Sequence, residues 1–366
     1  MQVPWSRPDV AAAETRAIAG VLKSGWLGMG PVTEAAEAAI ARFLGARHCV
    51  FVNNGTSALL AAYLAAGWGP GDEILVPTYT FIATVSAMVV LGCRPVLIDC
   101  DPATMNVDPE EVRRVAAEHP KAKGLVIVDV AGLSCDLDAL GEIAQERQLT
   151  LVEDAAEAFG GTYRGGYLGA RRHATIFSYH IAKQVTAVEG GAIVTQDGRI
   201  ARACRQLRSH GEGRQKYIHP ELGLNLRPTD INSAIALAQV RRTGTFLRRH
   251  RDHARRYREG LARFLNFQSV PEYATDPTWM VFQVLAHDRK TRDRLEAHLL
   301  KRGVQTRRAF PPMHQQPYLR RRFSFGKYPH ADWVYDRVLS LPMGNGIRTE
   351  EIDYVIDQTV RFFRSG

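Results

Sequence analysis

The stretch that decides how this chain folds is Phe177-Ser178-Tyr179-His180-Ile181-Ala182-Lys183-Gln184-Val185-Thr186-Ala187-Val188-Glu189-Gly190-Gly191. Its single lysine, Lys183, lies in an otherwise uncharged turn between two strand-like runs. A partly desolvated lysine loses some of its preference for the ammonium form and becomes an amine nucleophile for a carbonyl, as a Schiff base with pyridoxal phosphate (PLP) requires. An isolated lysine is more often a solvated surface residue, so the segments around it decide between the two interpretations.

An apolar strand that ends in carboxylates lies upstream, from Leu149 to Asp154. In open α/β sheets, ligands bind beyond the carboxyl ends of the strands, so Asp154 is placed to face a cofactor. An ionised carboxylate beside the pyridine nitrogen of PLP keeps that nitrogen protonated, and the protonated ring is an electron sink. We therefore predict this role for Asp154, with a helix cap as the alternative.

A phosphate site is predicted where the strand at His48 to Val52 runs into Gly55-Thr56-Ser57 and a helical segment. Glycine allows close backbone approach, the hydroxyls add donors, and the start of a helix presents free amides to an anion. Ser178 would add a further hydroxyl. A helix that begins with a capping Thr or Ser gives the same pattern without any ligand.

An aromatic side chain, Phe81, follows the strand at Glu73 to Val76 within the segment Pro77 to Thr84. At this sheet edge Phe81 is a candidate to stack on the pyridine ring. Burial in the core is the commoner fate of a phenylalanine, and the sequence leaves both interpretations open.

Short apolar strands alternate with helical stretches along the first part of the chain. The predicted strands are Cys49 to Val52, Glu73 to Val76, Arg94 to Ile98, Gly124 to Val128, Leu149 to Val152, Thr175 to Ser178 and Ala192 to Thr195. This alternation predicts an α/β fold with a mainly parallel seven-stranded sheet covered on both faces. A long helical pattern from Asp230 to Arg251 is predicted to link a large domain, residues 1–245, to a smaller α+β domain, residues 246–366.

The composition is typical of a cytoplasmic enzyme. Of the 366 residues, 45% are hydrophobic, which is enough for a sizeable core, and neither a long apolar run nor a signal-peptide pattern is present. We therefore expect no membrane association. The five cysteines are scattered without the paired spacing of metal sites, so we expect reduced, mostly buried thiols and no metal.

A formal net charge of +9 indicates an anionic partner. The basic clusters are Arg241-Arg242, Arg255-Arg256, Arg307-Arg308 and Arg320-Arg321-Arg322. The diphosphate of a nucleotide-linked sugar suits such a surface, although each cluster is also typical of a solvated helix. The sequence has no helix-turn-helix, zinc-finger or RNA-recognition signature, so nucleic-acid binding is disfavoured.

Taken in order, these motifs resemble the DegT/StrS family of sugar aminotransferases, which are fold-type I PLP enzymes. The resemblance rests on Gly55-Thr56-Ser57, Pro77 to Thr84, Glu153-Asp154-Ala155-Ala156, Ser178 to Gly191 and Gly223 to Arg227, with Ser6 to Asp9, Ser24 to Leu27 and Leu339 to Met343 near the two ends. It implies that Lys183 forms the Schiff base, that Asp154 pairs with the pyridine nitrogen and that Phe81 stacks on the ring. It also implies that the phosphate is held by Thr56, Ser57, Ser178 and, from the neighbouring subunit of a homodimer, Asn225.

Four positions depart from the family pattern. Glu157 stands where Gln or His is usual and would add negative charge near the PLP hydroxyl. Asp129 replaces the histidine of a Val-His-x-x-Gly turn, Arg172-His173 replaces Gly-Asp, and Ile181-Ala182 replaces Pro-Thr before the lysine. The related sugar 3-dehydratases carry histidine at the lysine position, so Lys183 argues against dehydration.

The resemblance implies transfer of an amino group from glutamate or glutamine to a nucleotide-linked keto sugar. A keto-cyclitol acceptor, or a reaction like that of the aminohydroxybenzoate synthases, is the alternative, because their Ala-Gly-Leu turn resembles Ala131-Gly132-Leu133. A DNA-binding regulator is the third interpretation.

Overall fold

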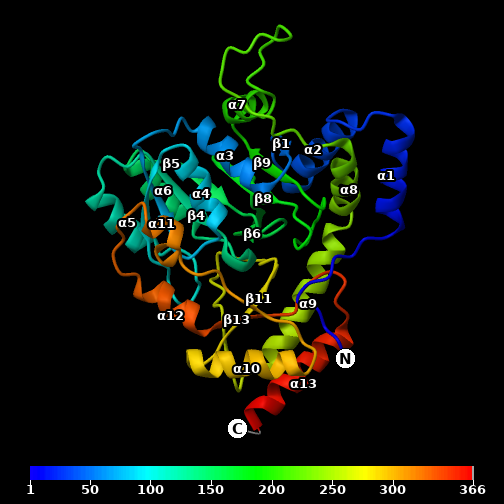
Figure 1. Ribbon diagram of the computed structural model, residues 1–366, viewed down its shortest axis with the longest axis vertical. Coiled ribbons are helices and arrows are strands. Elements are labelled where there is room, and N and C mark those ends of the chain that lie inside the picture. The colour runs from blue at the N-terminus through cyan, green and yellow to red at the C-terminus, as the bar shows by residue number, and fades with distance from the viewer. Residues whose placement is uncertain (365–366) are drawn as a thin grey trace.

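A seven-stranded sheet forms the centre of the computed structural model, which describes residues 1–364 (Figure 1). The strand order is β1-β9-β8-β5-β4-β2-β3. The strands are β1 (His48–Val52), β2 (Glu73–Pro77), β3 (Arg94–Ile98), β4 (Gly124–Val128), β5 (Thr150–Asp154), β8 (Ala174–Ser178) and β9 (Gly191–Thr195). Neighbouring strands from β3 to β8 are parallel, whereas β9 is antiparallel to both β8 and the edge strand β1. The predicted fold class is confirmed.

The sheet has a hydrophobic core on each face, because successive side chains of a strand point in opposite directions. Phe51 belongs to one core, while its neighbours Val50 and Val52 belong to the other. Each such buried side chain contributes about 1.5–3 kcal/mol relative to an exposed one. The first face is covered by α2 (Pro31–Leu44), α5 (Pro109–Glu118) and α6 (Leu137–Glu146), and the second by α3 (Gly55–Ala65), α4 (Ile82–Val90) and α7 (Gly198–Arg208).

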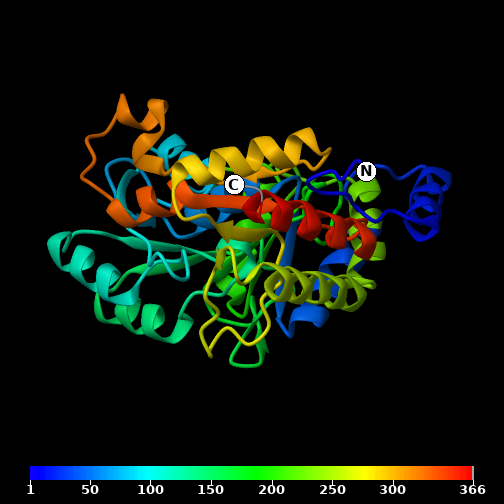
Figure 2. The ribbon, with the colours of Figure 1, turned by 90° about the horizontal axis from the view of Figure 1, so that it is seen from below.

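A four-stranded antiparallel sheet lies toward the C-terminal end of the chain, in the order β10-β11-β13-β12. Its strands are β10 (Asn266–Phe267), β11 (Phe282–Leu285), β12 (Arg307–Arg308) and β13 (Val338–Leu341). The helix α13 (Thr349–Arg364) lies between α9 (Thr243–Leu261) and α10 (Arg289–Lys301) (Figure 2). The division into residues 1–245 and 246–366 stays a prediction.

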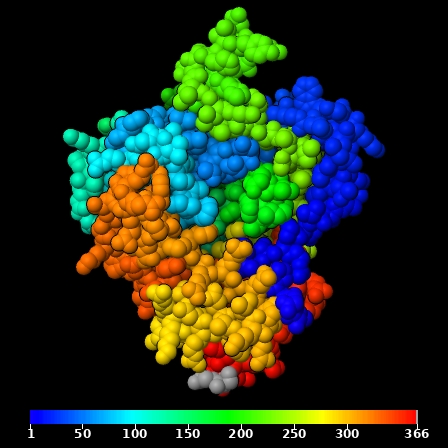
Figure 3. Space-filling model, in the orientation of Figure 1, coloured from blue at the N-terminus to red at the C-terminus, as the bar shows by residue number. Residues whose placement is uncertain are grey.

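The remaining elements are short, except for one N-terminal helix. They are α1 (Ala12–Ser24), β6 (Thr162–Tyr163), β7 (Gly166–Tyr167), the 3-10 helices η1 (Val130–Gly132) and η2 (Met313–Gln315), α11 (Pro317–Arg320) and α12 (Pro329–Arg337). The segment between α7 and α8 (Asp230–Val240), residues 209–229, includes a loop that projects from the body of the molecule (Figures 1 and 3), whereas Leu226 near its end is buried.

The predicted long helix from Asp230 is wrong in one respect, because it is divided into α8 (Asp230–Val240) and α9. The interruption falls at Arg241 and Arg242. There the Thr243 hydroxyl donates a 2.8 Å hydrogen bond to the carbonyl of Val240, and such local side-chain bonds compete with the helical backbone.

The first residues of the chain cross to the small sheet and are called here the N-terminal strap, residues 3–9. Val3 forms a parallel bridge with Val304. The carbonyl of Trp5 accepts a 3.0 Å hydrogen bond from the Met343 amide. The strap therefore lies against the loop that follows β13.

Within residues 1–364, no helix combines the length and apolar character that crossing a bilayer requires. All five cysteines are buried and free, so the prediction of buried thiols is confirmed.

Candidate functional site

Two predicted site residues meet at the carboxyl edge of the large sheet. Asp154 is the last residue of β5, and Lys183 lies in the turn that follows the neighbouring parallel strand β8. The side chain of Lys183 is 14% exposed, so it is not the solvated lysine of the alternative interpretation. Asp154 is buried, and the charge on Lys183 acts on its carboxylate. The sheet thus brings a shielded amine and a buried carboxylate together.

Hydrogen bonds fix the orientation of the Asp154 carboxylate. The Thr84 hydroxyl donates to Oδ2 at 2.7 Å, and the Ala156 amide donates to Oδ1 at 3.2 Å. Thr80 lies behind Thr84, with their hydroxyl oxygens 2.8 Å apart. Burial raises the pKa of Asp154 above its ordinary value, while Thr84, Ala156 and Lys183 oppose that rise. Asp154 closes a strand, so the alternative of a helix cap does not apply.

Glu157 lies directly beside the lysine. Its Oε1 is 3.4 Å from Lys183 Nζ, and its Oε2 accepts a 2.9 Å hydrogen bond from the Ala131 amide. The carbonyl of Glu157 is also held, by the Gln184 side chain at 2.9 Å and the Thr278 hydroxyl at 2.7 Å. Glu157, which differs from the usual Gln or His of the family pattern, therefore places a fixed carboxylate next to the amine of Lys183.

The start of α3 faces Ser178. A Cβ on Gly55 would lie 3.1 Å from Ser178 Cβ and 3.2 Å from its Oγ, so a larger residue would press on that side chain. Asn54 caps the helix by accepting a 2.8 Å bond from the Ser57 amide. Among the described residues the amides of Gly55 and Thr56 have no hydrogen-bond partner, as expected at a helix start. Because Asn54 supplies the cap, the Thr56 and Ser57 hydroxyls stay available for an anion.

Phe81 is half exposed, so the alternative that it belongs to the core is wrong. It precedes α4, and its ring centroid is 4.8 Å from that of Phe310, at an interplanar angle of 54°. No local motif marks Phe310, which comes from the loop after β12 and reaches Phe81 only through tertiary folding. The threonines that orient Asp154 were also missed, although both lie in the motif around Phe81.

Asn225 is exposed and lies in the segment between α7 and α8. Its backbone forms an isolated bridge with Ser209, and its side-chain oxygen accepts a 3.4 Å bond from the Arg227 amide. No contact among the described residues joins it to Lys183 or Asp154. Its neighbour Leu226 accepts a 3.0 Å backbone hydrogen bond from Asn53, two residues before α3.

Two of the departures meet around Glu153, which is fully buried on β5. His173 Nε2 lies 3.0 Å from Glu153 Oε2, and the Thr175 hydroxyl donates to the same oxygen at 2.6 Å. Burial would raise the pKa of Glu153, but His173 and Thr175 hold it below its ordinary value. Burial and the charge of Glu153 raise the pKa of Asp129 well above its ordinary range. The protonated form of Asp129 is therefore favoured by its burial and by the neighbouring Glu153.

The family pattern has histidine at the position of Asp129 and aspartate at that of His173, so the two residue types have changed places around Glu153. Asp129→His and His173→Asp alone are each expected to destabilise the protein by about 2–5 kcal/mol, because each unbalances a buried charge network. The double variant is expected to recover more than half of the summed loss. Urea unfolding of the four proteins measures this coupling.

Strictly additive losses in the double variant would contradict this compensation. His119→Ala is the matched control, because His119 pairs with Glu73 at the surface, where its side chain is 35% exposed. Such a pair contributes about 0–1 kcal/mol.

Three of the four basic clusters contain at least one arginine that forms an ion pair within the chain. Ion pairs join Arg242 to Asp9 and Glu14, Arg255 to Asp252 and Glu259, Arg256 to Asp353, and Arg308 to Asp293 and Glu296. Arg307 instead lies over the ring of Trp5. These pairs screen the arginines that form them, whereas the net charge of +9 already counts the acidic residues and is unchanged by the pairing.

The site fits PLP in three respects: a shielded lysine, a buried carboxylate held by hydrogen bonds, and a helix start with two unpartnered amides beside a serine. Together with the sheet, these features define the fold-type I class of PLP-dependent transferases. The chain belongs to the DegT/DnrJ/EryC1/StrS aminotransferase family, whose model matches residues 8–360. It is accordingly a PLP-dependent aminotransferase by family.

Solved structures of the family superpose closely on the chain. DesV of S. venezuelae is 34% identical, with a TM-score of 0.91, and the match covers 97% of this chain and 95% of DesV. 3-Amino-5-hydroxybenzoic acid synthase is 26% identical, with a TM-score of 0.89 and full coverage of both chains at 100%. Helicobacter pylori PseC, an aminotransferase involved in the biosynthesis of pseudoaminic acid, has a TM-score of 0.93 and covers 100% of both chains, but at 24% identity it supports the fold alone.

Proposed function

We propose that the protein binds PLP and transfers an amino group from glutamate or glutamine to the ketone of a nucleotide-linked keto sugar. The observation that carries the proposal is the placement of a shielded Lys183 and a buried, oriented Asp154 at one edge of the sheet. PLP, when bound, supplies the electron sink for the reaction. The family assignment supports amino transfer as the reaction class.

Each site residue has a distinct task in this proposal. Asp154 would hold the ring nitrogen of the cofactor in its protonated form, and the Thr84 hydroxyl fixes the orientation of that carboxylate. Lys183 would hold the cofactor through its amine and, once free, would carry the proton that amino transfer requires. Glu157, with its Oε1 3.4 Å from that amine, would help to fix the position of the lysine side chain.

The phosphate and ring of the cofactor are assigned to residues around α3 and α4. The amides of Gly55 and Thr56, with the hydroxyls of Thr56, Ser57 and Ser178, would hold the phosphate. Phe81 offers a half-exposed ring face for stacking.

A keto-cyclitol or a related cyclic acceptor is the second candidate. It is favoured by the similarity to 3-amino-5-hydroxybenzoic acid synthase and by the Ala131-Gly132-Leu133 turn, whose first amide is held by Glu157. The proposal of a DNA-binding regulator is weaker, because Arg242, Arg256 and Arg308 of the basic clusters are engaged in ion pairs within the chain.

An acceptor panel tests the proposed function. With PLP and glutamate or glutamine, the purified protein is expected to convert nucleotide-linked keto sugars to amines, detected by mass spectrometry, and to leave keto-cyclitols unchanged. Amination of cyclitols alone would favour the second candidate. Absence of amino transfer from a colourless protein that binds DNA in a salt-sensitive way would reject both.

We also propose that the active unit is a cytoplasmic homodimer with shared sites. Asn225 is exposed and directly follows the exposed apolar residues Leu222 and Leu224, an arrangement suited to contact with a second copy. Asn225 would then reach the phosphate bound in the partner's site.

Mixing the inactive variants Lys183→Ala and Asn225→Ala is expected to restore activity as their subunits exchange. Each mixed dimer keeps one site with both native residues, so recovery approaches about half of the normal turnover per mixed dimer. Failure to recover activity despite demonstrated subunit exchange, or full activity of a strict monomer, would refute the shared site.

A further inference from the structure

Gln184, the residue after the lysine, is held through both its side chain and its backbone carbonyl. Gln184 is 2% exposed, and its side-chain Nε2 donates to the Glu157 carbonyl at 2.9 Å. Its own carbonyl accepts a hydrogen bond from Asn345 Nδ2. At Lys183 itself, the backbone makes the local bond from its amide to the His180 carbonyl, at 2.9 Å. The long-range support of the lysine backbone therefore passes through Gln184.

Asn345 comes from a distant part of the chain, the loop after β13, and is 3% exposed. It lies between two glycines that the N-terminal strap approaches closely. A Cβ on Gly344 would lie 3.0 Å from the backbone of Arg7, and one on Gly346 would lie 2.8 Å from the Pro8 carbonyl. The Gly346 amide also donates to the Arg7 carbonyl at 2.8 Å. The strap thus packs on both sides of Asn345.

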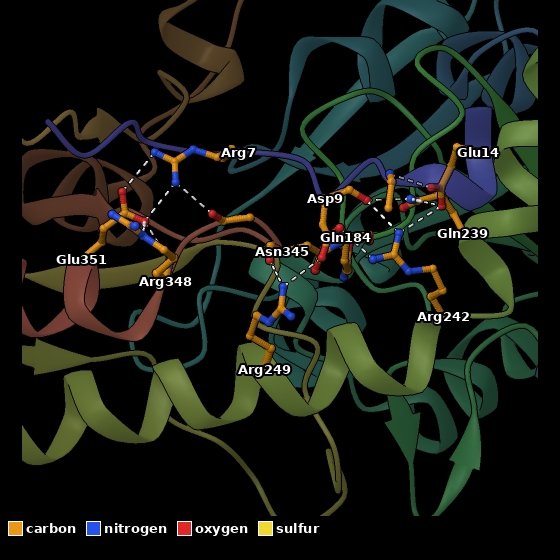
Figure 4. Close-up of polar contacts among 12 residues, drawn as sticks. Arg7, Asp9, Glu14, Gln184, Gln239, Arg242, Arg249, Asn345, Arg348 and Glu351 are labelled. Atoms are coloured by element: carbon orange, nitrogen blue, oxygen red, sulfur yellow. Dashed lines mark hydrogen bonds and ion pairs between the residues drawn. The ribbon is translucent and has the colours of Figure 1, made fainter. Parts of the chain in front are cut away.

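An arginine completes the connection to the strap (Figure 4). Arg249 of α9 donates both to the carbonyl of Asn345 and, at 3.1 Å, to the carboxylate of Asp9. Asp9 is held in turn by Arg242 at 2.7 Å. A continuous set of polar contacts therefore runs from the strap through Arg249 and Asn345 to Gln184.

We propose that Asn345 is a positioning residue that sets the place of the Lys183 amine relative to Asp154 and Glu157. The inference rests on the proposed function, since it assigns a role to the support of that lysine. The turn at residues 179–190 contains no helix or strand, and its backbone bonds are local to the turn, so contacts such as that from Asn345 are what tie it to distant parts of the chain. A displacement of about 1 Å at a reacting group can reduce turnover about 100-fold.

The test compares Asn345→Ala and Asn345→Asp with the control Arg348→Ala. The aspartate variant keeps the size of the side chain but replaces the N–H donor with a carboxylate that repels the Gln184 carbonyl. Arg348 lies in the same loop region and pairs with Glu351, with 67% of its side chain exposed and no contact with Gln184. Borohydride reduction of each PLP-loaded protein, followed by peptide mapping, counts the labelled Lys183 sites, and kcat is expressed per labelled site.

Both Asn345 variants are expected to keep PLP on Lys183 but to lose about 10- to 100-fold in kcat per labelled site, with KM for the amino donor changed less than about threefold. Arg348→Ala is expected to match the unsubstituted protein. A merely structural role would reduce the number of labelled sites without changing kcat per site, and that result would overturn the proposal. If Asn345→Ala does not fold, Asn345→Asp decides. Absence of label on Lys183 in the unsubstituted protein would instead reject the proposed function itself.

Discussion

Replacement of Lys183 by alanine is expected to lower the rate of amino transfer by about 10⁴-fold or more, because one side chain supplies both the covalent attachment and the proton transfer. The visible absorption of the PLP-loaded protein is expected to disappear with the amine. Borohydride reduction is expected to fix the cofactor on Lys183 in the unsubstituted protein and to leave no stable label in Lys183→Ala. Steady-state assays, absorption spectra and peptide mapping measure these effects.

Lys123→Ala is the matched control, because Lys123 forms a surface ion pair with Asp72 and its side chain is 61% exposed. This variant is expected to retain normal turnover and normal labelling. Labelling of another lysine in the unsubstituted protein, or appreciable turnover in Lys183→Ala, would remove Lys183 from the proposed reaction.

Asp154→Asn is expected to retain PLP but to lower turnover by about 10²- to 10³-fold, the range seen when one oriented electrostatic group is removed from an active site. A neutral amide cannot hold the pyridine nitrogen in its protonated form. The affinity for PLP, measured by absorbance titration, is expected to change less than turnover, because phosphate contacts at the start of α3 are untouched. Turnover within about threefold of normal would reject the assigned role.

The same substitution is expected to leave the cofactor-free protein at least as stable as before. Burial raises the pKa of Asp154 in the folded protein. Above its ordinary pKa the unfolded chain ionises more readily than the folded one, so this carboxyl lowers stability at neutral pH and ceases to do so below about pH 4. Thermal unfolding of cofactor-free Asp154→Asn at pH 7 checks this sign. A large loss of stability there would show that the carboxylate serves mainly to hold the fold.

The parts of the structure that depend on local sequence were predictable. Apolar runs such as Gly124 to Val128 form strands because their residues suit a sheet buried on both faces, and confirmed strands then place Asp154 and Lys183 at one edge. Conversely, the interruption between α8 and α9 depends on a single side-chain bond from Thr243, which periodicity does not reveal.

Contacts between segments far apart in the chain could not be predicted from the sequence. Neither the exposure of Phe81 beside Phe310 nor the bond from Asn345 to Gln184 has a local signature, since each partner lies in an irregular loop. In the sequence, Asp129 and His173 are two unconnected departures from the family pattern. Only the fold shows that both act on Glu153 and so belong to one change.

The antiparallel strand β9 also constrains how the protein is made. β1 lies at the sheet edge and pairs with β9, so residue 48 meets residue 195 across a long loop of chain. Contacts of such sequence separation form late, because the chain entropy lost on closing the loop must be overcome first. During synthesis on a ribosome, we therefore expect β1 to remain unpaired, and the start of α3 to lack its final packing, until the lysine turn and β9 have emerged. We expect the start of α3 and the lysine turn to become ordered together. A nascent chain that stops before β9 leaves the edge of β8 unpaired and open to aggregation.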